Sequence, residues 1–407
     1  MESSPGMPER LSAKALSDRE SAQSIEHAST SEEFPGSLRR LFPITEQYVY
    51  LNHASVAPLS RPAREAMVRA LDGSMYHGPR ISEEMDAVQA ATRSRAAKLV
   101  NAEAHQFAFL RNTSDALSAV ANGISWCPGD NLVTTSVEFP ANVYPWQRIA
   151  EAQGIELRVQ NQMDGYIDVD ELLRLVDGRT RVVTISWVQF STGQRLDLRR
   201  IGNFCRERDI LFVVDAVQGL GALQLDVRAD AVDAFAAGAQ KFLLGPKGIS
   251  LLYLSDRALE RIKPTVIGWT AVKGYSDYLS HDLDFRDGAI RFEGGTLNVP
   301  GICGLGEALD LFLRVGLEKI ENHLLALSDY FAQELTRRGY RVTSPRAPNE
   351  RSAILICRHP QFTGEQICAH LDSQNIIVSA RLEGLRIAPH FYNTREEADA
   401  LVAALPG

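Results

Sequence analysis

The chain has 407 residues, with 43 Lys and Arg against 51 Asp and Glu, so its net charge is −8. Its length allows two to three domains with a large core. The apolar fraction of 45% and the charged fraction of 23% are ordinary for a soluble globular protein. No run approaches the ~18 uninterrupted apolar residues of a membrane helix. The first residues lack the apolar stretch of a cleaved secretion signal.

Charge and cysteine spacing exclude further classes of protein. The acidic balance, without Lys or Arg blocks, argues against nucleic acid as a partner. Five cysteines without a CxxC or CxxH spacing argue against a disulfide framework and against a metal site. We therefore expect a cytoplasmic enzyme or a cytoplasmic binding protein with no metal, membrane or nucleic-acid partner.

The first part of the chain has the composition of a disordered segment. Residues 1–35 are rich in Ser, Glu and Ala, and their only aromatic residue is Phe34. Such a segment buries too little apolar surface to offset the entropy lost on ordering. We predict a disordered N-terminal arm over 1–35.

From Leu41 onward, helical and strand patterns alternate. Apolar residues three and four apart predict helices over 61–73, 82–100, 115–124, 168–176 and 198–209. Short apolar runs bounded by Gly, Pro and Asp predict strands over 107–110, 131–136, 181–187, 210–216 and 249–254. Near-continuous apolar strands that alternate with helices indicate a mostly parallel sheet covered on both faces.

After Pro300 the pattern changes to that of a small α+β domain. One long helix is predicted over 306–339, and shorter helices over 363–374 and 394–405. Strands are predicted over 352–358, 376–381 and 385–391. Between the two parts, the Gly-, Tyr- and Asp-containing stretch 269–285 is typical of a long surface loop.

A carboxylate and a lysine follow two of the apolar runs. Asp215 ends a strand, which places it at the carboxyl edge of the sheet, where open α/β sheets bind ligands. Lys241 follows another short apolar strand and precedes a Gly/Pro-rich turn. A pyridoxal phosphate (PLP) site needs such a pair, because the lysine forms the Schiff base and the carboxylate keeps the pyridine nitrogen protonated. Taken alone, Asp215 is more simply explained as a strand-end aspartate and Lys241 as a solvated lysine.

A phosphate cradle is predicted at the start of the helix near 115. Thr113 and Ser114 stand where this helix begins, with Asp115 in its first turn. Backbone N–H groups and hydroxyls at a helix N-terminus bind phosphate, although simple N-capping would explain the same residues.

Together the motifs resemble the class V aminotransferase family, the cysteine desulfurase-like branch of fold type I PLP-dependent enzymes. The resemblance runs from about Tyr48 to Leu405. The motifs stand in the family's order: YLNHASVAPLS (50–60), NTSDAL (112–117), SVEFPANVYPW (136–146), STGQRLDL (191–198), VDAVQ (214–218), QKFLLGPKG (240–248), FEGGTLNVPGICGLGEAL (292–309) and LRIAPHFYNT (385–394).

The resemblance implies an α/β fold of type I. A large PLP-binding domain over 61–290 would hold a mostly parallel seven-stranded sheet between helices. A smaller C-terminal α+β domain would cover 291–407, and an N-terminal segment over 36–60 would pack near the active site.

The resemblance also implies roles for the cofactor-site residues. Lys241 would form the Schiff base and move protons at the substrate α-carbon, and Asp215 would pair with the pyridine nitrogen. Gln218 would contact O3′ of the cofactor or the lysine region. Thr113 and Ser114 would bind the phosphate.

Other residues are implied to act on the substrate or across subunits. Thr296 would reach the phosphate of a neighbouring subunit, which implies a homodimer with shared active sites. Arg386 matches the arginine that clamps the α-carboxylate of the amino-acid substrate, and Arg381 is a second candidate. Asn52 and His53 lie where the family's N-terminal segment lines the substrate pocket, although His53 would equally fit a structural histidine.

Residues that differ from the desulfurase pattern restrict the reactions that we expect the chain to catalyse. Phe139 stands where desulfurases stack a histidine on the cofactor; it would bind the cofactor by stacking on the ring but cannot relay a proton. Phe190 replaces an asparagine near the cofactor, so Gln189 is expected to substitute. Gln240 replaces a common histidine and Gly238 a phosphate-binding serine.

The stretch that carries the nucleophilic cysteine in desulfurases reads SARLEG (379–384) and holds no Cys. Cys205, Cys357 and Cys368 have the pattern of core residues, and Cys127 and Cys303 are less certain. Sulfur transfer requires a thiolate aimed at the substrate, so a persulfide-forming desulfurase is disfavoured.

The function expected is that of a PLP-dependent enzyme acting on the α-carbon of an amino acid through Lys241, by amino-group transfer or side-chain cleavage. The alternative is a C–S or β-lyase, or an isopenicillin N epimerase-like enzyme. A PLP-binding scaffold without turnover is the alternative from outside the enzymes.

Overall fold

The computed structural model describes residues 34–162 and 165–406. Most of the arm predicted over 1–35 lies outside these ranges, so its disorder stays a prediction. The described chain begins at a turn before α2 (Gly36–Arg39).

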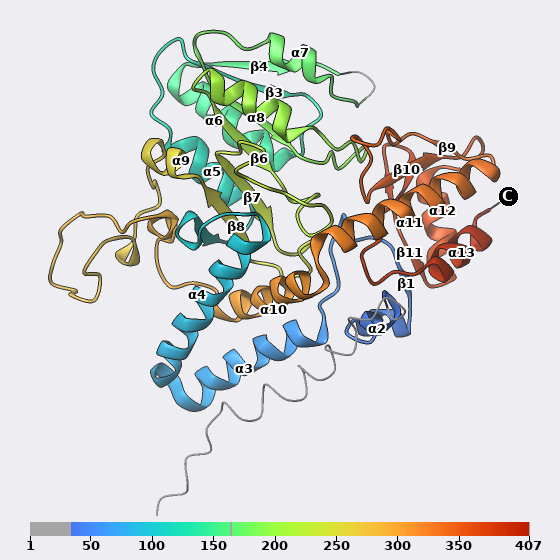
Figure 1. Ribbon diagram of the computed structural model, residues 1–407, viewed down its shortest axis with the longest axis horizontal. Coiled ribbons are helices and arrows are strands. Elements are labelled where there is room, and N and C mark those ends of the chain that lie inside the picture. The colour runs from blue at the N-terminus through green and yellow to red at the C-terminus, as the bar shows by residue number, and fades with distance from the viewer. Residues whose placement is uncertain (1–33, 163–164, 407) are drawn as a thin grey trace, which may run out of the picture.

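A seven-stranded sheet forms the centre of the larger part of the molecule (Figure 1). Its spatial order is β2 (Phe107–Leu110), β8 (Ser250–Leu254), β7 (Ala234–Gly238), β6 (Leu211–Asp215), β5 (Thr180–Ser186), β3 (Asn131–Thr135) and β4 (Glu156–Gln160). Strand β8 runs antiparallel to β2 and β7, and the other pairs are parallel. The mostly parallel seven-stranded sheet is therefore confirmed.

Helices cover this sheet, as its continuous apolar strands require. Every residue of β3, β6, β7 and β8 is buried. The helices that pack on the strands of this sheet are α4 (Ser82–Leu99), α5 (Thr113–Gly123), α6 (Tyr144–Gln153), α7 (Val169–Arg174), α8 (Leu198–Glu207) and α9 (Asp256–Arg261). Helix α3 (Arg61–His77) lies away from the sheet, at the bottom of Figure 1. Short 3-10 helices lie at η2 (Pro43–Glu46), η3 (Gly78–Ile81), η4 (Ala104–Gln106), η5 (Pro140–Asn142), η6 (Trp269–Ala271) and η7 (Ala289–Phe292).

The C-terminal part is a smaller α+β unit (Figure 1). Its antiparallel sheet has the order β12 (Ser379–Arg381), β13 (Gly384–Ile387), β10 (Leu355–Arg358) and β9 (Arg341–Val342). The helices of this unit are α11 (Leu317–Arg337), α12 (Gly364–Asp372) and α13 (Arg395–Ala404). The N-terminal strand β1 (Val49–Tyr50) pairs in parallel with β11 (Ile376–Ile377), so the segment before α3 is attached to this unit.

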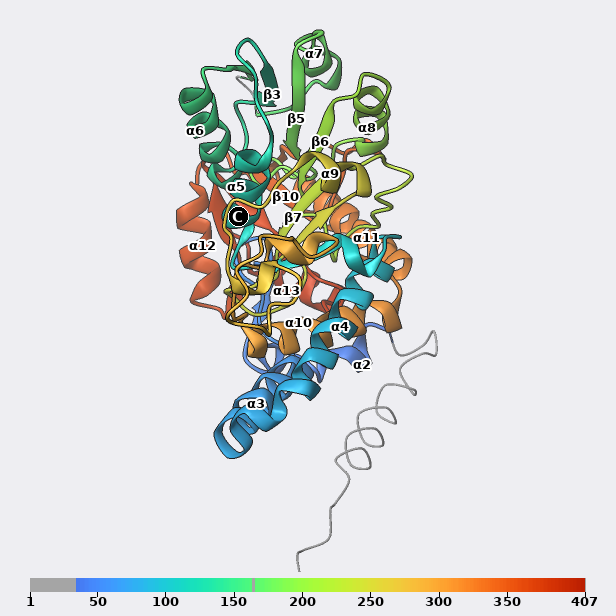
Figure 2. The ribbon, with the colours of Figure 1, turned by 90° about the vertical axis from the view of Figure 1, so that its left-hand side faces the viewer.

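The single long helix predicted over 306–339 is wrong. The chain forms α10 (Val299–Val315) and then α11, with Gly316 between them. Gly316 has φ 88° and ψ 124°, a conformation that residues with a Cβ rarely adopt. Helix α10 packs along α3 and α4 (Figure 2), whereas α11 packs on α13 and β9. The domain boundary at 290/291 stays a prediction. Within the described ranges, no helix is both long and apolar enough to cross a membrane.

We predict that Gly316→Ala destabilises the protein by about 1–3 kcal/mol through backbone strain alone. A Cβ at this position would meet no atom within 4 Å, so a steric clash does not contribute. Gly178→Ala is the matched control, because Gly178 also has open space around it but does not have a positive φ. Equal unfolding free energies of the two variants, measured with denaturant, would contradict the prediction.

Candidate active site

The carboxylate of Asp215 is buried at the end of β6 with one oxygen unpaired. Its side chain is 1% exposed. Oδ1 accepts a hydrogen bond from the Val217 backbone N–H at 3.0 Å, and Oδ2 has no partner among the described residues. Burial raises the pKa of Asp215 to about 7, opposed by the hydrogen bond from Val217. A buried acceptor without a donor is costly, so Oδ2 is suited to pair with an N–H group of a ligand.

Lys241 lies close to this carboxylate. It follows β7, which is the neighbour of β6 in the sheet. Burial lowers the pKa of Lys241 to about 8; Asp215 opposes the shift, and the positive charges of Arg386 and Arg381 add to it. Lys241 Nζ lies 5.2 Å from the centroid of the Phe139 ring. The structure therefore brings together the lysine and the carboxylate that the sequence predicted.

The start of α5 is tied to the end of β7, next to Lys241. Thr113 Oγ1 accepts a hydrogen bond from the Gly238 N–H at 3.0 Å. Asn112 caps the helix by accepting from the Asp115 N–H at 2.9 Å. Ser114 is exposed at the same helix end. Thr113 and Ser114 thus begin a helix at the site, as predicted, and their phosphate-binding role stays a prediction.

The surroundings of Gly238, where the resemblance expects a serine, leave little room for a side chain. A Cβ at Gly238 would lie 2.7 Å from Gln240 Oε1 and 3.0 Å from Thr113 Oγ1. The side chain of Gln240 therefore occupies the space that a serine side chain at 238 would need.

Two aromatic and two amide side chains line the same region. Phe139 is 39% exposed, and its ring meets that of Phe190 edge to face, with centroids 5.2 Å apart. Gln189 donates to Glu138 at 2.9 Å, and Gln218 donates to the Ala54 carbonyl at 3.1 Å. The Oε1 atoms of both glutamines are buried without a partner within the described part of the chain.

Arg386 is a buried cation held only by neutral groups. It is 1% exposed. Its guanidinium donates to Ser379 Oγ at 3.1 Å, to the Phe190 carbonyl at 3.2 Å and to Ser55 Oγ at 2.6 Å. Across residues 34–162 and 165–406 it forms no ion pair. Burial and the charge of Arg381 lower the pKa of Arg386 to about 9. Such a group is suited to bind an incoming carboxylate.

Arg381 lies on the same face of the β12–β13 hairpin. Ser379 is the cross-strand partner of Arg386, and Arg381 is two residues from Ser379. The side chain of Arg381 is half-buried and donates to the Ala380 carbonyl at 2.7 Å. Arg381 is thus placed as a second positive charge near Arg386.

His53 is not available to a ligand in this structure. It is fully buried, with Nδ1 2.9 Å from the Ala388 carbonyl and Nε2 2.7 Å from the Tyr392 hydroxyl. The carbonyl requires Nδ1 to donate, so Nε2 accepts from the tyrosine. These contacts support a structural role, and the substrate-binding role of His53 stays a prediction.

Glu138 belongs to the site but was missed in the sequence. It is buried, and its carboxylate accepts hydrogen bonds from Ser186, Gln189 and Asn142. Burial raises the pKa of Glu138, and these donors oppose the shift. Its negative charge also contributes to the raised pKa of Asp215. The only signal in the sequence was a charged residue next to Phe139 in an otherwise uncharged motif.

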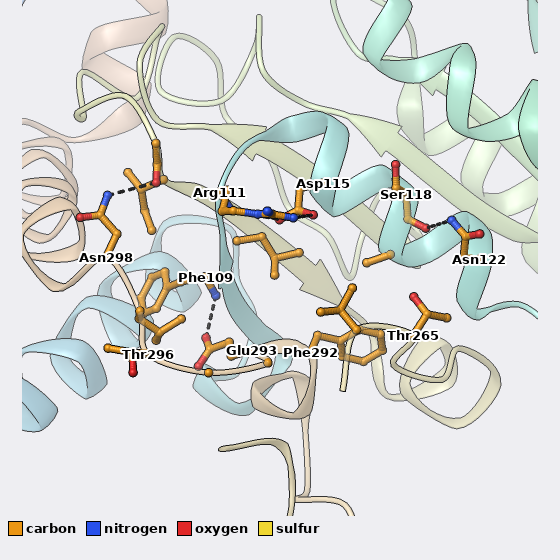
Figure 3. A pocket seen from close by; sticks show the side chains of 18 residues that line it. Phe109, Arg111, Asp115, Ser118, Asn122, Thr265, Phe292, Glu293, Thr296 and Asn298 are labelled. Atoms are coloured by element: carbon orange, nitrogen blue, oxygen red, sulfur yellow. Dashed lines mark hydrogen bonds and ion pairs between the residues drawn. The ribbon is translucent and has the colours of Figure 1, made fainter. Parts of the chain in front are cut away.

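Thr296 lies apart from these groups, on an exposed loop that lines a cavity of about 340 Å³ (Figure 3). The loop is anchored by Glu293, which accepts from the Phe109 N–H at 2.7 Å (Figure 3). Glu293 also forms a buried bidentate ion pair with Arg93, with N–O distances of 2.5 and 2.9 Å. The cavity is not lined by Lys241 or Asp215. The predicted contact of Thr296 with a neighbouring subunit stays a prediction.

The stretch 379–384, where the resemblance would place a nucleophilic cysteine, forms a hairpin with a short turn. Leu382 and Glu383 alone connect β12 to β13, both with positive φ. All five cysteines are described, and each is a free thiol. Burial raises the pKa of Cys205 and Cys357 to about 12, so neither is activated as a thiolate.

The residues present fit PLP. The unpaired Asp215 Oδ2 matches a protonated ring nitrogen, Lys241 supplies the amine, and the start of α5 offers N–H groups for a phosphate. Phe139 offers a ring face for stacking beside Lys241.

We predict that stability falls as pH decreases, because His53 is buried in its neutral form. Burial lowers its pKa from 6.5 to about 4. Between these values the unfolded chain binds the proton and the folded chain does not, so about 3 kcal/mol is lost as pH falls from 6.5 to 4. The slope of unfolding free energy against pH should become shallower in His53→Gln and stay unchanged in the control His281→Gln, at an exposed residue. An unchanged slope in His53→Gln would refute this.

Comparison with known proteins agrees with this geometry. The model of the family described as aminotransferase class-V matches residues 49–402. A probable cysteine desulfurase of Methanothermobacter thermautotrophicus is 31% identical over 301 residues, which cover 72% of this chain and 73% of the relative. The uncharacterized aminotransferase YcbU of Bacillus subtilis is 26% identical over 366 residues, or 90% of this chain and 96% of that protein.

A solved structure shows the same fold. The cystine C–S lyase C-DES, in complex with its reaction product cysteine persulfide, matches with a TM-score of 0.82 at 24% identity. The match covers 89% of this chain and 98% of that chain. Another structure of C-DES holds glycine covalently linked to the PLP cofactor. Since the family model spans nearly all of the folded chain, the resemblance read from the motifs is confirmed, and the chain belongs to the class-V aminotransferase family of PLP-dependent enzymes.

Proposed function

We propose that this enzyme acts on the α-carbon of an amino acid through Lys241, by transferring its amino group or by cleaving its side chain. The observation that carries the proposal is the grouping of Lys241 and Asp215, at the carboxyl edge of the seven-stranded sheet, with Arg386 of β13, whose guanidinium has no counter-ion among the described residues. These groups supply an amine, a partner for the cofactor ring and a clamp for a carboxylate.

Each residue has a distinct part in the proposed reaction. When bound, PLP supplies the electron sink that stabilises negative charge at the substrate α-carbon. Lys241, with its pKa lowered to about 8, is neutral in about one tenth of molecules at pH 7, far more than an ordinary lysine, and is suited to take up and return a proton at that carbon. Arg386 would orient the amino acid by donating two hydrogen bonds to its carboxylate. Asp215 would hold the ring nitrogen.

The proposed chemistry does not include a protein persulfide. The two-residue turn between β12 and β13 carries Leu382 and Glu383 and no thiol. Amino-group transfer and β-elimination need no protein nucleophile beyond Lys241. A C–S or β-lyase, or an isopenicillin N epimerase-like enzyme, therefore remains the alternative proposal.

We further propose that the enzyme works as a homodimer with shared active sites. Large apolar side chains are exposed on α3 and on the loop 269–285, which lie on the same side of the molecule (Figure 2). Leu279 is 90% exposed and Tyr278 74%. Exposed apolar residues of this kind mark protein–protein contacts. Five free thiols fit the reducing cytoplasm, where we propose the enzyme works.

We predict that wild-type protein binds PLP with a visible absorbance band and turns over at least one member of an amino-acid panel. Lys241→Ala should abolish turnover. Arg386→Lys keeps the positive charge but loses the two parallel N–H donors of the guanidinium. The variant should therefore still bind the cofactor, and its KM for the amino acid should rise about 10- to 100-fold. The control is Arg341→Lys, at an exposed position in the same small sheet.

The reaction products distinguish amino-group transfer, elimination and epimerisation. A turnover that needs a 2-oxo acid acceptor indicates amino-group transfer, whereas release of ammonia and a 2-oxo acid without an acceptor indicates elimination. Racemisation of the substrate alone indicates an epimerase. A protein that binds PLP but turns over no amino acid would be the inert scaffold and would refute the proposal.

We predict a dimer by light scattering. The double change Tyr278→Asp and Leu279→Asp should weaken the dimer, because it places two charges in the proposed contact. Tyr144→Asp, at an exposed residue of α6 outside this surface, is the control. A monomeric wild type would refute the shared active site.

A further inference from the structure

The carboxylate of Glu138 is buried and accepts four hydrogen bonds. Oε1 accepts from the Ser186 N–H at 2.8 Å and from Gln189 Nε2 at 2.9 Å. Oε2 accepts from Ser186 Oγ at 2.5 Å and from Asn142 Nδ2 at 3.0 Å. Glu138 thereby connects the chain after β3 to the end of β5 and to the loop that follows it.

The neighbours of Glu138 fix the direction of these bonds. Asn142 Oδ1 accepts from Trp146 Nε1 and from Thr184 Oγ1, both at 2.9 Å. The indole N–H can only donate, so the amide nitrogen of Asn142 must face Glu138. The backbone N–H of Ser186 can only donate as well. Each carboxylate oxygen of Glu138 therefore already faces a donor that cannot act as an acceptor instead.

This arrangement determines which atom Gln189 presents. An amide oxygen turned toward Glu138 would meet a carboxylate acceptor, so Gln189 donates to Glu138 and its Oε1 points elsewhere. That Oε1 is buried and has no partner in the described part of the chain, as is also true of Asp215 Oδ2. Ser186, which donates twice to Glu138, is the cross-strand partner of Asp215 in the parallel pair β5–β6.

Glu138 also helps to fix the position of Phe139. Phe139 is the next residue and caps η5, where its carbonyl accepts from the Asn142 N–H at 2.8 Å. Both ends of this short turn are thus fixed by Glu138 and its partner Asn142. The Phe139 ring, beside Lys241 Nζ, depends on that turn for its position.

We propose that Glu138 is a positioning residue of the cofactor site: it makes Gln189 an acceptor toward the bound cofactor or substrate and holds the Phe139 ring beside Lys241. The inference rests on the proposed function, because it assumes that PLP occupies this site. It assigns a role to a residue that does not itself reach the reacting atoms. A purely structural role would stabilise the fold without changing the cofactor's environment, and the test separates the two.

The test compares Glu138→Gln with Thr184→Val. Glu138→Gln keeps the size of the side chain but places an amide donor against at least one of the fixed donors. Thr184→Val removes one bond to Asn142 and leaves all four bonds of Glu138 in place, so it serves as the control for lost stability. The measurements are the PLP dissociation constant, the pH titration of the bound-cofactor absorbance and the unfolding free energy.

We expect Glu138→Gln to weaken PLP binding about tenfold or more. We also expect it to move the titration midpoint to lower pH, because loss of a buried negative charge disfavours protonated groups nearby. Thr184→Val should lower stability without either change. The inference would be overturned if Glu138→Gln left PLP binding and the titration midpoint unchanged, or if Thr184→Val changed both equally. The proposed function would still stand in that case, provided that the wild-type protein binds PLP.

A further variant covers the case in which Glu138→Gln does not fold. Gln189→Met removes the amide and leaves the other three bonds of Glu138, and the inference expects weaker PLP binding in this variant too. Unchanged binding in Gln189→Met would then overturn it. Wild-type protein that binds no PLP would overturn both the inference and the proposed function.

Discussion

The unpaired oxygen of Asp215 is the constraint on which the site depends. A buried acceptor without a donor costs about 1–3 kcal/mol, and here it is maintained because helices on both faces of the sheet exclude water from the end of β6. The same dry environment lowers the pKa of Lys241 and leaves Arg386 without a counter-ion among the described residues. A single packing arrangement thus leaves an acceptor for a cofactor, an amine that loses its proton more easily than an ordinary lysine, and a guanidinium suited to bind a carboxylate.

The sequence predicted the parts of this arrangement that follow from local pattern. The strand over 107–110 and the position of Asp215 at a strand end matched the structure, because continuous apolar runs bounded by turns carry that information. Strand β4 was not predicted, since its pattern includes the exposed Glu156 and pairing with β3 supplies its stability. The break at Gly316 was missed because apolar periodicity continues across it.

Residues whose roles depend on distant partners could not be placed in this way. The sequence does not distinguish a buried histidine whose two ring nitrogens are hydrogen-bonded from a histidine that binds a ligand. The partners of His53 lie 335 and 339 residues away along the chain, at Ala388 and Tyr392. Glu138 was missed for the same reason, because its contacts to Ser186 and Gln189 cross from one strand connection to another. Tertiary contacts, rather than propensity, decide both roles.

The departures from the desulfurase pattern have a common physical consequence. Phe139 and Phe190 stand where the resemblance expects a histidine and an asparagine; their rings pack edge to face, and that of Phe139 lies beside Lys241. Neither ring can exchange a proton, and the turn at Leu382 and Glu383 supplies no thiol. In the proposed enzyme, proton transfer at the α-carbon therefore falls to Lys241. The choice between amino-group transfer and cleavage then depends on where Lys241 returns the proton and on what leaving group the substrate carries.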